Sequence, residues 1–239
     1  MSLEEVEARL ARAALLLDFD GTLSPIVVRP EEARPVAGAA EVLAGLVERV
    51  ATVTIVTGRR SAFIRSVLPV DDLEVIGQFG MEGSPPIPLE VLAEVNVAAV
   101  GEPGVRVVDK GASIAVHVRT APDPDAATAR ISGPLVAIAE RYGLDVLPGK
   151  RVLELARKGS SKGTVVAEVV ARMGAEAALY AGDDLGDMLA FDALEVLAAG
   201  GVAICRIAVV GDETPEELIA KADLTVAGPE ELLTLLRAL

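Results

Sequence analysis

The chain has 239 residues, of which 51% are hydrophobic and 24% are charged. A chain of this length can bury about 70–75% of its surface on folding, and its composition excludes an intrinsically disordered or low-complexity protein. The formal net charge of −14 would repel phosphate backbones, so we expect no nucleic acid among its partners.

Strands and helices alternate through the first 80 residues. Residues 15–19 form a short apolar segment between loops, as expected of a strand that is buried on both faces of a sheet. Residues 37–49 place apolar side chains at helical spacing, and residues 52–56 are all β-branched, which is typical of a second strand. A helix at 61–68 and a third strand at 73–77 complete this part of the chain.

The middle of the chain breaks this alternation. A proline-rich hinge at 84–88 and a polar hinge at 158–161 bound a segment with its own pattern. In that segment we predict strands at 105–109 and 113–118, a helix at 125–142, and strands at 145–147 and 152–155. Long insertions at the carboxyl edge of a parallel sheet usually cover a ligand site. We therefore expect a core of residues 1–84 and 159–239 and an inserted α/β cap of residues 85–158.

The alternation resumes after the second hinge. The elements predicted there are a helix at 163–173, a strand at 177–181, a short helix at 188–193, strands at 202–210 and 224–227, and a last helix at 230–239. Thr214 is predicted to cap a further helix that has Pro215 in its first turn and Glu217 three residues after the cap. Alternating strands and helices predict an α/β fold with a doubly wound parallel sheet.

The single cysteine and the lengths of the apolar runs indicate in which cellular compartment we expect the protein. Cys205 excludes an intramolecular disulfide and a multi-cysteine zinc site, and its apolar surroundings predict a buried structural thiol. The apolar run at 13–17 is too short for a transmembrane helix or a signal sequence. We therefore expect a cytoplasmic protein with no membrane partner, and the sequence indicates no obligate protein partner.

Two acidic loops follow predicted strands. Asp18 and Asp20 come after the first strand, and two carboxylates one residue apart can share a divalent cation. Asp183, Asp184 and Asp187 follow the strand at 177–181, and they would raise one another's pKa unless a cation held them. Oxygen ligands with no His or Cys nearby favour Mg²⁺ over zinc or copper. Either loop alone could be a surface turn, but their matching positions favour a shared metal site.

Two further motifs could bind a phosphate group. Thr57 and Gly58 follow the second strand and offer a hydroxyl and backbone N–H groups at a helix entrance. Lys162 supplies a cation at the start of another helix. Each motif alone could be an ordinary turn or a surface lysine. Four such motifs at strand ends or helix starts are poorly explained by chance.

In order and spacing, these motifs resemble those of the haloacid dehalogenase-like phosphohydrolases. The resemblance implies that Asp18 is a nucleophile that forms an aspartyl-phosphate, with Asp20 as general acid and base. The residues implied to bind the phosphoryl group are Thr57, Gly58 and Lys162. The residues implied to hold Mg²⁺ are Asp18, Asp20 through its carbonyl oxygen, Asp183, and Asp187 or Asp184 in support.

Segments of the insert narrow the resemblance to the trehalose-6-phosphate phosphatases. Residues 110–119 and 149–155 are similar to that family's cap motifs, and residues 80–82 resemble its Gly-x-Glu segment. The resemblance covers nearly the whole chain and implies a sugar-phosphate substrate, trehalose 6-phosphate first of all. The residues implied to bind the sugar are Glu82, Lys110, His117, Arg119, Lys150 and Glu154.

Lys150 and Glu154 suit a lid that excludes water and binds sugar hydroxyls. Along one strand their spacing of four would put both on one face, where they could also form an ion pair with no ligand. His117, the only histidine, could be a packed cap residue instead of a sugar contact. The mechanism does not require it as a base.

The chain departs from the family pattern in three places. Phe79 stands where many members have His, and residues 155–157 replace a common Arg-Pro. Residues 185–188 read Leu-Gly-Asp-Met where the family usually has Thr-Asp-Glu after a variable residue, and Asp187 aligns with that Asp. These departures concern the substrate more than the reaction. The alternatives are therefore a sucrose phosphate, mannosylglycerate phosphate or other sugar-phosphate phosphatase. A mutase or phosphotransferase is also compatible, whereas a catalytically silent binding protein would be expected to have lost Asp18 or Asp20.

Overall fold

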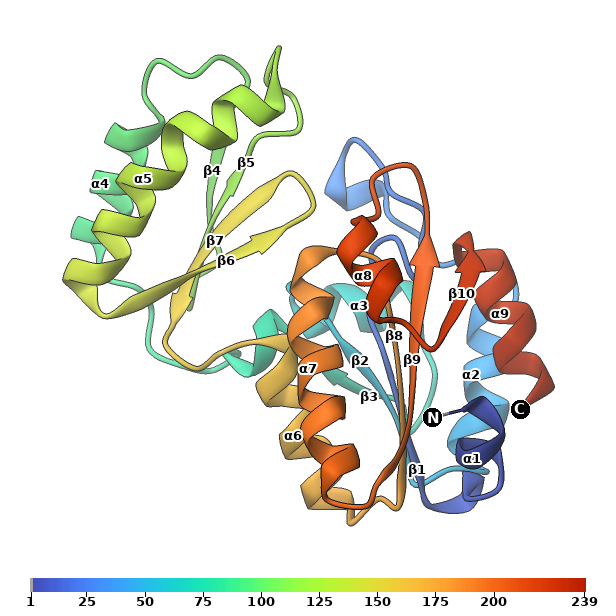
Figure 1. Ribbon diagram of the computed structural model, residues 1–239. Coiled ribbons are helices and arrows are strands. Elements are labelled where there is room, and N and C mark those ends of the chain that lie inside the picture. Colours follow the sequence, from blue (N-terminus) through green and yellow to red (C-terminus); the bar gives the residue numbers. More distant parts are fainter. Residues whose placement is uncertain (1) are drawn as a thin grey trace. The chain divides into compact units, whose positions relative to one another are not determined.

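The computed structural model describes residues 2–239, which form two compact units (Figure 1). The core unit contains the residues up to Gly80 together with Ser161–Leu239, and the insert unit contains Met81–Ser160. Each unit has its own sheet and its own apolar core.

The core unit is built on a six-stranded sheet in which all neighbouring strands are parallel. The strand order is β10-β9-β8-β1-β2-β3. The strands are β1 (Ala13–Leu17), β2 (Thr52–Val56), β3 (Glu74–Ile76), β8 (Ala177–Gly182), β9 (Ala203–Val210) and β10 (Leu224–Ala227). The predicted doubly wound parallel sheet is therefore confirmed.

Helices cover both faces of this sheet (Figure 1). The helices whose apolar side chains pack on one face are α1 (Leu3–Glu7), α2 (Ala39–Val47), α3 (Ser61–Val67) and α9 (Gly228–Ala238). Those that pack on the other face are α6 (Lys162–Met173), α7 (Leu185–Ala199) and α8 (Glu216–Lys221). Three short 3₁₀ turns lie at Leu10–Arg12, Pro30–Glu32 and Gln78–Gly80.

The central strand β1 is apolar at every position because both of its faces are covered. Leu15 and Leu17 point into the cluster on one face of the sheet and Leu16 points into the cluster on the other. A strand buried on both faces has no alternating polar side. Cys205 on β9 is also fully buried, which raises the pKa of its thiol to about 12 and confirms the predicted structural thiol.

Two predictions about the second half of the core are wrong. The short helix predicted at 188–193 is part of the longer α7, which begins at Leu185 because Asp184 caps it. Thr214 does not cap α8, whose N-cap is Pro215. The Thr214 hydroxyl instead donates to the carbonyl of Val209 and accepts from Gly211 N–H, so it closes the turn after β9.

The insert unit has a four-stranded antiparallel sheet in the order β4-β5-β7-β6. Its strands are β4 (Arg106–Asp109), β5 (Ile114–His117), β6 (Leu144–Gly149) and β7 (Val152–Arg157), and its helices are α4 (Leu89–Ala99) and α5 (Pro124–Tyr142). The two predicted hairpins with a helix between them are confirmed, whereas α4 was not predicted. None of the helices in residues 2–239 has the length and apolarity to cross a membrane.

Candidate active site

The site lies where the core sheet changes its direction of winding. The chain passes from β1 to β2 and β3 on one side, and later adds β8, β9 and β10 on the other. In open α/β sheets, ligands bind beyond the carboxyl ends of the strands at such a point. Leu17 pairs with Ile55 and with Ala181, so the residues just after β2, β1 and β8 share one edge.

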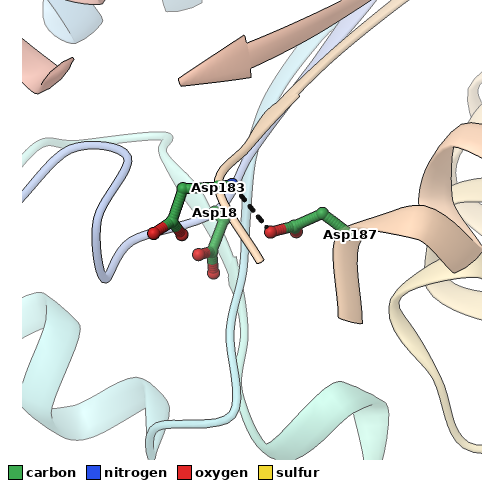
Figure 2. A group of neighbouring side chains, drawn as sticks. All are labelled: Asp18, Asp183 and Asp187. Carbon is green, nitrogen blue, oxygen red and sulfur yellow. Dashed lines mark hydrogen bonds between the residues drawn. The ribbon is translucent and has the colours of Figure 1, made fainter. Parts of the chain in front are cut away.

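Three acidic side chains meet at this edge (Figure 2). Asp18, Asp183 and Asp187 are buried, and each offers a carboxylate oxygen that lies within 4.8 Å of the others'. Asp18 and Asp183 follow adjacent strands, whereas Asp187 reaches the group from the first turn of α7. Sequence positions far apart in the chain are thus brought together by the sheet order.

Asp187 is hydrogen-bonded to α6, to β8 and to the backbone of the acidic loop. Its Oδ1 accepts hydrogen bonds from Lys162 Nζ at 2.7 Å and from the Tyr180 hydroxyl at 2.6 Å. Its Oδ2 accepts from the backbone N–H groups of Asp183 and Asp184, both at 2.9 Å. With four donors on its two oxygens, Asp187 orients the acidic loop.

Asp184 is placed differently from Asp183. Its carboxylate caps α7 by accepting from Gly186 N–H at 2.8 Å, and its backbone forms a capping box with Asp187. It is not part of the group within 4.8 Å. The sequence left open which of the two neighbouring residues touches a metal, and the geometry favours Asp183.

Lys162 is the cation buried among these acids. It is the first residue of α6, and its Nζ lies 3.2 Å from Asp18 Oδ1 as well as contacting Asp187. Burial alone would lower the pKa of Lys162, but the charges of Asp18, Asp184 and Asp187 raise it well above its ordinary value. Lys162 is therefore held as an ammonium ion.

Asp18 is in the opposite electrostatic situation to Lys162. Burial raises the pKa of Asp18, and the like charges of Asp187, Asp183 and Asp184 add to this against the attraction of Lys162. Four carboxylates around one ammonium leave excess negative charge in a buried place. A divalent cation bound by carboxylate oxygens would compensate that charge, so the donor set fits a hard cation.

Gly21 makes room for the acidic loop. Its φ is +85°, and a Cβ at this position would lie 1.9 Å from Asp183 Oδ2. Only a residue without a side chain allows the turn after β1 to approach Asp183 this closely.

The predicted phosphate motif follows β2, next to Asp18. Thr57 is buried, and its Oγ1 accepts the Arg59 N–H at 3.2 Å. Gly58 packs under the ring of Phe79, since a Cβ there would lie 2.8 Å from Phe79 Cζ. Gly58 therefore makes room for the Phe79 ring, and a side chain at position 58 would displace that ring.

Asp20 is not in the acidic group; it is paired with a residue that we did not predict. Arg59 Nε donates to Asp20 Oδ2 at 2.6 Å and Nη2 donates to Oδ1 at 2.7 Å. Tyr180 is the other residue that sequence analysis missed. Arg59 directly follows the predicted motif of Thr57 and Gly58, and Tyr180 lies in the strand predicted before Asp183. Their partners, however, depend on which strands are neighbours in the sheet.

The insert unit brings together part of the predicted sugar-binding set. Lys110 Nζ lies 2.8 Å from Glu154 Oε2, and Ser113 Oγ donates to Glu154 Oε1 at 2.5 Å. Leu153 and Leu155 on β7 point into the apolar core, so Glu154 lies on the opposite face of the sheet.

The strand position predicted for Lys150 is wrong. Lys150 lies in the two-residue turn between β6 and β7, so it does not share a strand face with Glu154. The spacing of four spans a hairpin turn, which breaks the alternation on which the prediction depended. Arg119 Nη2 donates to the Lys150 carbonyl at 3.3 Å and links the end of β5 to this turn.

The remaining two residues of the predicted sugar-binding set, His117 and Glu82, lie at other places in the insert unit. His117 is the last residue of β5 and is half-buried, on the face opposite Val116. Glu82 is exposed in a turn at the start of the insert unit.

Comparisons with known proteins identify the family to which this sequence is similar. A profile described as trehalose-phosphatase matches residues 16–223. The trehalose-phosphate phosphatase of Mycobacterium avium (strain 104) is 33% identical over 213 residues, which cover 80% of this chain and 54% of that protein. An uncharacterized glycosyl hydrolase of Mycobacterium tuberculosis (strain ATCC 25618 / H37Rv) is 34% identical over 212 residues, 79% of this chain and 16% of that protein. The chain thus spans about half or less of the length of these relatives.

Solved structures share the fold. A trehalose-6-phosphate phosphatase related protein has a TM-score of 0.67 at 26% identity, with 94% of this chain and 96% of that chain covered. The C-terminal domain of C. albicans trehalose-6-phosphate phosphatase has a TM-score of 0.81 at 21% identity, covering 100% and 97%. A haloacid dehalogenase-like hydrolase from Bacteroides thetaiotaomicron reaches 0.60 at 15% identity, covering 95% and 98%. The predicted haloacid dehalogenase-like fold is therefore confirmed.

Proposed function

Because the chain belongs to the trehalose-phosphatase family, we propose that it hydrolyses a sugar phosphate, trehalose 6-phosphate first of all, with Mg²⁺ as cofactor. The observation that carries the proposal is the position of Asp18. Its carboxylate lies beside Asp183 and Asp187 and 3.2 Å from the ammonium of Lys162. A carboxylate can attack a phosphate dianion only where such positive charge offsets the repulsion between them.

The proposed reaction has two displacements, and Asp20 enters the first as the neutral carboxyl. An oxygen of Asp18 attacks phosphorus, the bond from phosphorus to the sugar oxygen breaks, and that oxygen takes the proton of the Asp20 carboxyl. Asp20, now a carboxylate, takes a proton from the water that attacks phosphorus. The bond between Asp18 and phosphorus then breaks, inorganic phosphate leaves, and both residues return to their starting state.

The other core residues bind and orient the phosphoryl group. Lys162 neutralises charge on its oxygens, while the Thr57 hydroxyl and the backbone N–H at Gly58 donate to them. Asp187 keeps Lys162 aimed at the nucleophile through their hydrogen bond at 2.7 Å.

Asp18, Asp183 and the carbonyl oxygen of Asp20 would hold Mg²⁺. When bound, the ion supplies charge that keeps Asp18 ionised and polarises the phosphoryl group. Asp187, whose oxygens already accept four hydrogen bonds, would support the ion through the loop and not by direct contact. Asp184 would remain the cap of α7.

We assign recognition of the sugar to the insert unit. The pair of buried Glu154 and half-buried Lys110, together with the turn that carries Lys150, presents charged groups of both signs. Each of these groups is able to bind a pair of hydroxyls. Arg119, His117 and Glu82 complete the proposed set.

The function is tested by phosphate release from a panel of esters at fixed Mg²⁺. We expect kcat/KM for trehalose 6-phosphate to exceed that for glucose 6-phosphate by tenfold or more, on the order of one well-placed hydrogen bond to a charged group. Asp18→Asn should release no phosphate, and the exposed control Asp71→Asn should match the wild type. Equal kcat/KM for the two sugars would refute the disaccharide, and a better rate on sucrose phosphate or mannosylglycerate phosphate would replace it. An active Asp18→Asn protein would refute the mechanism.

The metal has a test that does not depend on activity. Mg²⁺ that binds only the folded protein raises the free energy of unfolding by about 2.7 kcal/mol at a concentration one hundred times its Kd. We expect Mg²⁺ to raise Tm in the wild type but not in Asp183→Asn. An equal rise in both proteins would place the ion elsewhere.

A further inference from the structure

Arg59 donates two hydrogen bonds from its guanidinium group to the carboxylate of Asp20. The two hydrogen bonds, at 2.6 Å and 2.7 Å, form the parallel bidentate pair that fixes the plane of a carboxylate as well as its position. Asp20 itself is 36% exposed, so without this pair a short side chain at a turn would rotate freely.

Arg59 is itself held from three directions. Nη1 donates to the Pro30 carbonyl at 2.7 Å, and Cζ lies 4.5 Å from the ring centre of Phe63 and 5.7 Å from that of Phe19. The two ring centres lie 6.3 Å apart in an edge-to-face arrangement, so both rings pack against the guanidinium group. An arginine that merely balanced surface charge would need none of these contacts.

Arg59 also connects two strand ends. Asp20 follows β1 and Arg59 follows β2, and the Arg59 N–H donates to the Thr57 hydroxyl. The residue that orients Asp20 thus shares its turn with the proposed phosphate-binding residue Thr57. We therefore expect a change in that turn to affect both groups.

We propose that Arg59 is a positioning residue that holds Asp20 in line with the leaving oxygen of the substrate. This rests on the proposed function, in which Asp20 donates the proton that the sugar oxygen takes as its bond to phosphorus breaks. Arg59 acts through Asp20 and makes no contact with the reacting atoms. The Asp20 carboxylate accepts both guanidinium hydrogen bonds, whereas the protonated carboxyl keeps one of them on its carbonyl oxygen and turns its O–H toward the sugar oxygen. Misplacing a reacting group by about 1 Å can cost on the order of one hundredfold in rate.

The dependence on the leaving group separates this role from others. A sugar alkoxide is a poor leaving group that needs a proton, whereas p-nitrophenolate leaves without one. A residue that positions the acid therefore matters for a sugar phosphate and little for p-nitrophenyl phosphate. A residue that binds the phosphoryl group, or that only supports the fold, matters equally for both.

The experiment compares Arg59→Met, Arg59→Lys, Asp20→Asn and the matched control Arg60→Met, an exposed arginine at the next position. For each protein, kcat and kcat/KM are measured on p-nitrophenyl phosphate and on the sugar phosphate that the wild type hydrolyses fastest. We expect Arg59→Met to lose roughly ten- to one hundredfold on the sugar phosphate and less than about threefold on the aryl phosphate. Arg59→Lys, which lacks the fork, should recover only part of the loss.

A double variant completes the test. If Arg59 acts through Asp20, Arg59→Met adds nothing on the sugar phosphate once Asp20 is Asn. Equal losses on both esters, or losses that multiply in the double variant, would overturn the inference. Wild-type protein that hydrolyses neither ester would instead refute the proposed function, so the two failures are distinguishable.

Discussion

The ammonium group of Lys162 lies 2.7 Å from Oδ1 of Asp187, an oxygen that also accepts the Tyr180 hydroxyl. These residues come from the start of α6, the first turn of α7 and strand β8. Their contact joins the cation that neighbours Asp18 to the loop that carries Asp183. Three elements from the second half of the core chain, α6, α7 and β8, therefore meet at one carboxylate, next to Asp18 from the first half.

Asp187→Asn should disrupt the hydrogen bonds that Asp187 accepts. Whichever way the amide is turned, its NH₂ group faces groups that donate to Asp187 in the wild type. These are either the Lys162 ammonium and the Tyr180 hydroxyl, or the backbone N–H groups of Asp183 and Asp184. A buried donor left without an acceptor costs about 1–3 kcal/mol. We expect lower stability in urea unfolding and loss of phosphate release, measured on the same preparations.

The matched control is Asp192→Asn on the same helix, where the carboxylate pairs with Lys221 near the surface. That pair is about half exposed, so its loss should change stability by less than about 1 kcal/mol. Asp187→Asn protein with the stability and activity of the control would show that the four hydrogen bonds do not hold the loop.

Gly163→Ala should separate the two helices that carry Lys162 and Asp187. A Cβ at position 163 would lie 2.4 Å from the Leu189 carbonyl oxygen, so α6 and α7 must move apart. Overpacking of this kind costs typically about 1–3 kcal/mol. The control Gly45→Ala in α2, where no atom lies within 4 Å of the added Cβ, should stabilise the protein by about 0.5–1 kcal/mol. Equal effects in urea unfolding would contradict the close crossing.

The elements that sequence analysis predicted well are those whose burial is complete. Leu15, Leu16 and Leu17 are apolar in sequence because both faces of β1 are covered, and that pattern is visible without a structure. The convergence of the loops after β1, β2 and β8 was also predictable, because carboxyl ends of parallel strands share an edge.

What sequence analysis missed depends on pairing between segments. Lys150 stands between the strands predicted at 145–147 and 152–155, after the turn dipeptide Pro148-Gly149. Counting its spacing from Glu154 along one strand ignored that turn, and the β6–β7 register shows the hairpin. The helix α4 buries only Val91 and Val95 among its residues, so its periodic pattern is weak. The pair of Arg59 and Asp20 depends on which strands are neighbours, and spacing along the chain does not contain that information.

Lys150→Ala should affect the sugar more than the phosphate. We expect kcat/KM to fall roughly tenfold or more for a disaccharide phosphate, the loss of one charged hydrogen bond, with little change for a small aryl phosphate. Lys158→Ala, which removes an exposed lysine from the same unit, is the control and should leave both rates unchanged. Equal losses on both esters would make Lys150 a structural residue of the turn.

Asp223→Asn should weaken the edge of the core sheet in a pH-dependent way. Asp223 precedes β10 and accepts hydrogen bonds from Arg206 on β9, with Nε at 3.0 Å from Oδ2 and Nη2 at 3.0 Å from Oδ1. Burial would raise the pKa of Asp223, but these bonds outweigh burial and lower it. The stabilisation is therefore full above the unfolded pKa, about 3.9, and is lost as pH falls through the lower folded pKa.

We expect Asp223→Asn to lose about 1–3 kcal/mol at pH 7, a loss that shrinks once the pH drops below about 4, because the wild type then loses the ionised pair as well. Urea unfolding at several pH values measures this difference. Glu176→Gln, which breaks an exposed pair with Arg12, should cost less than about 1 kcal/mol at every pH. If Asp223→Asn lost the same free energy at pH 7 and at pH 3, its charge would not be the cause, and the contact between β9 and β10 would rest on shape alone.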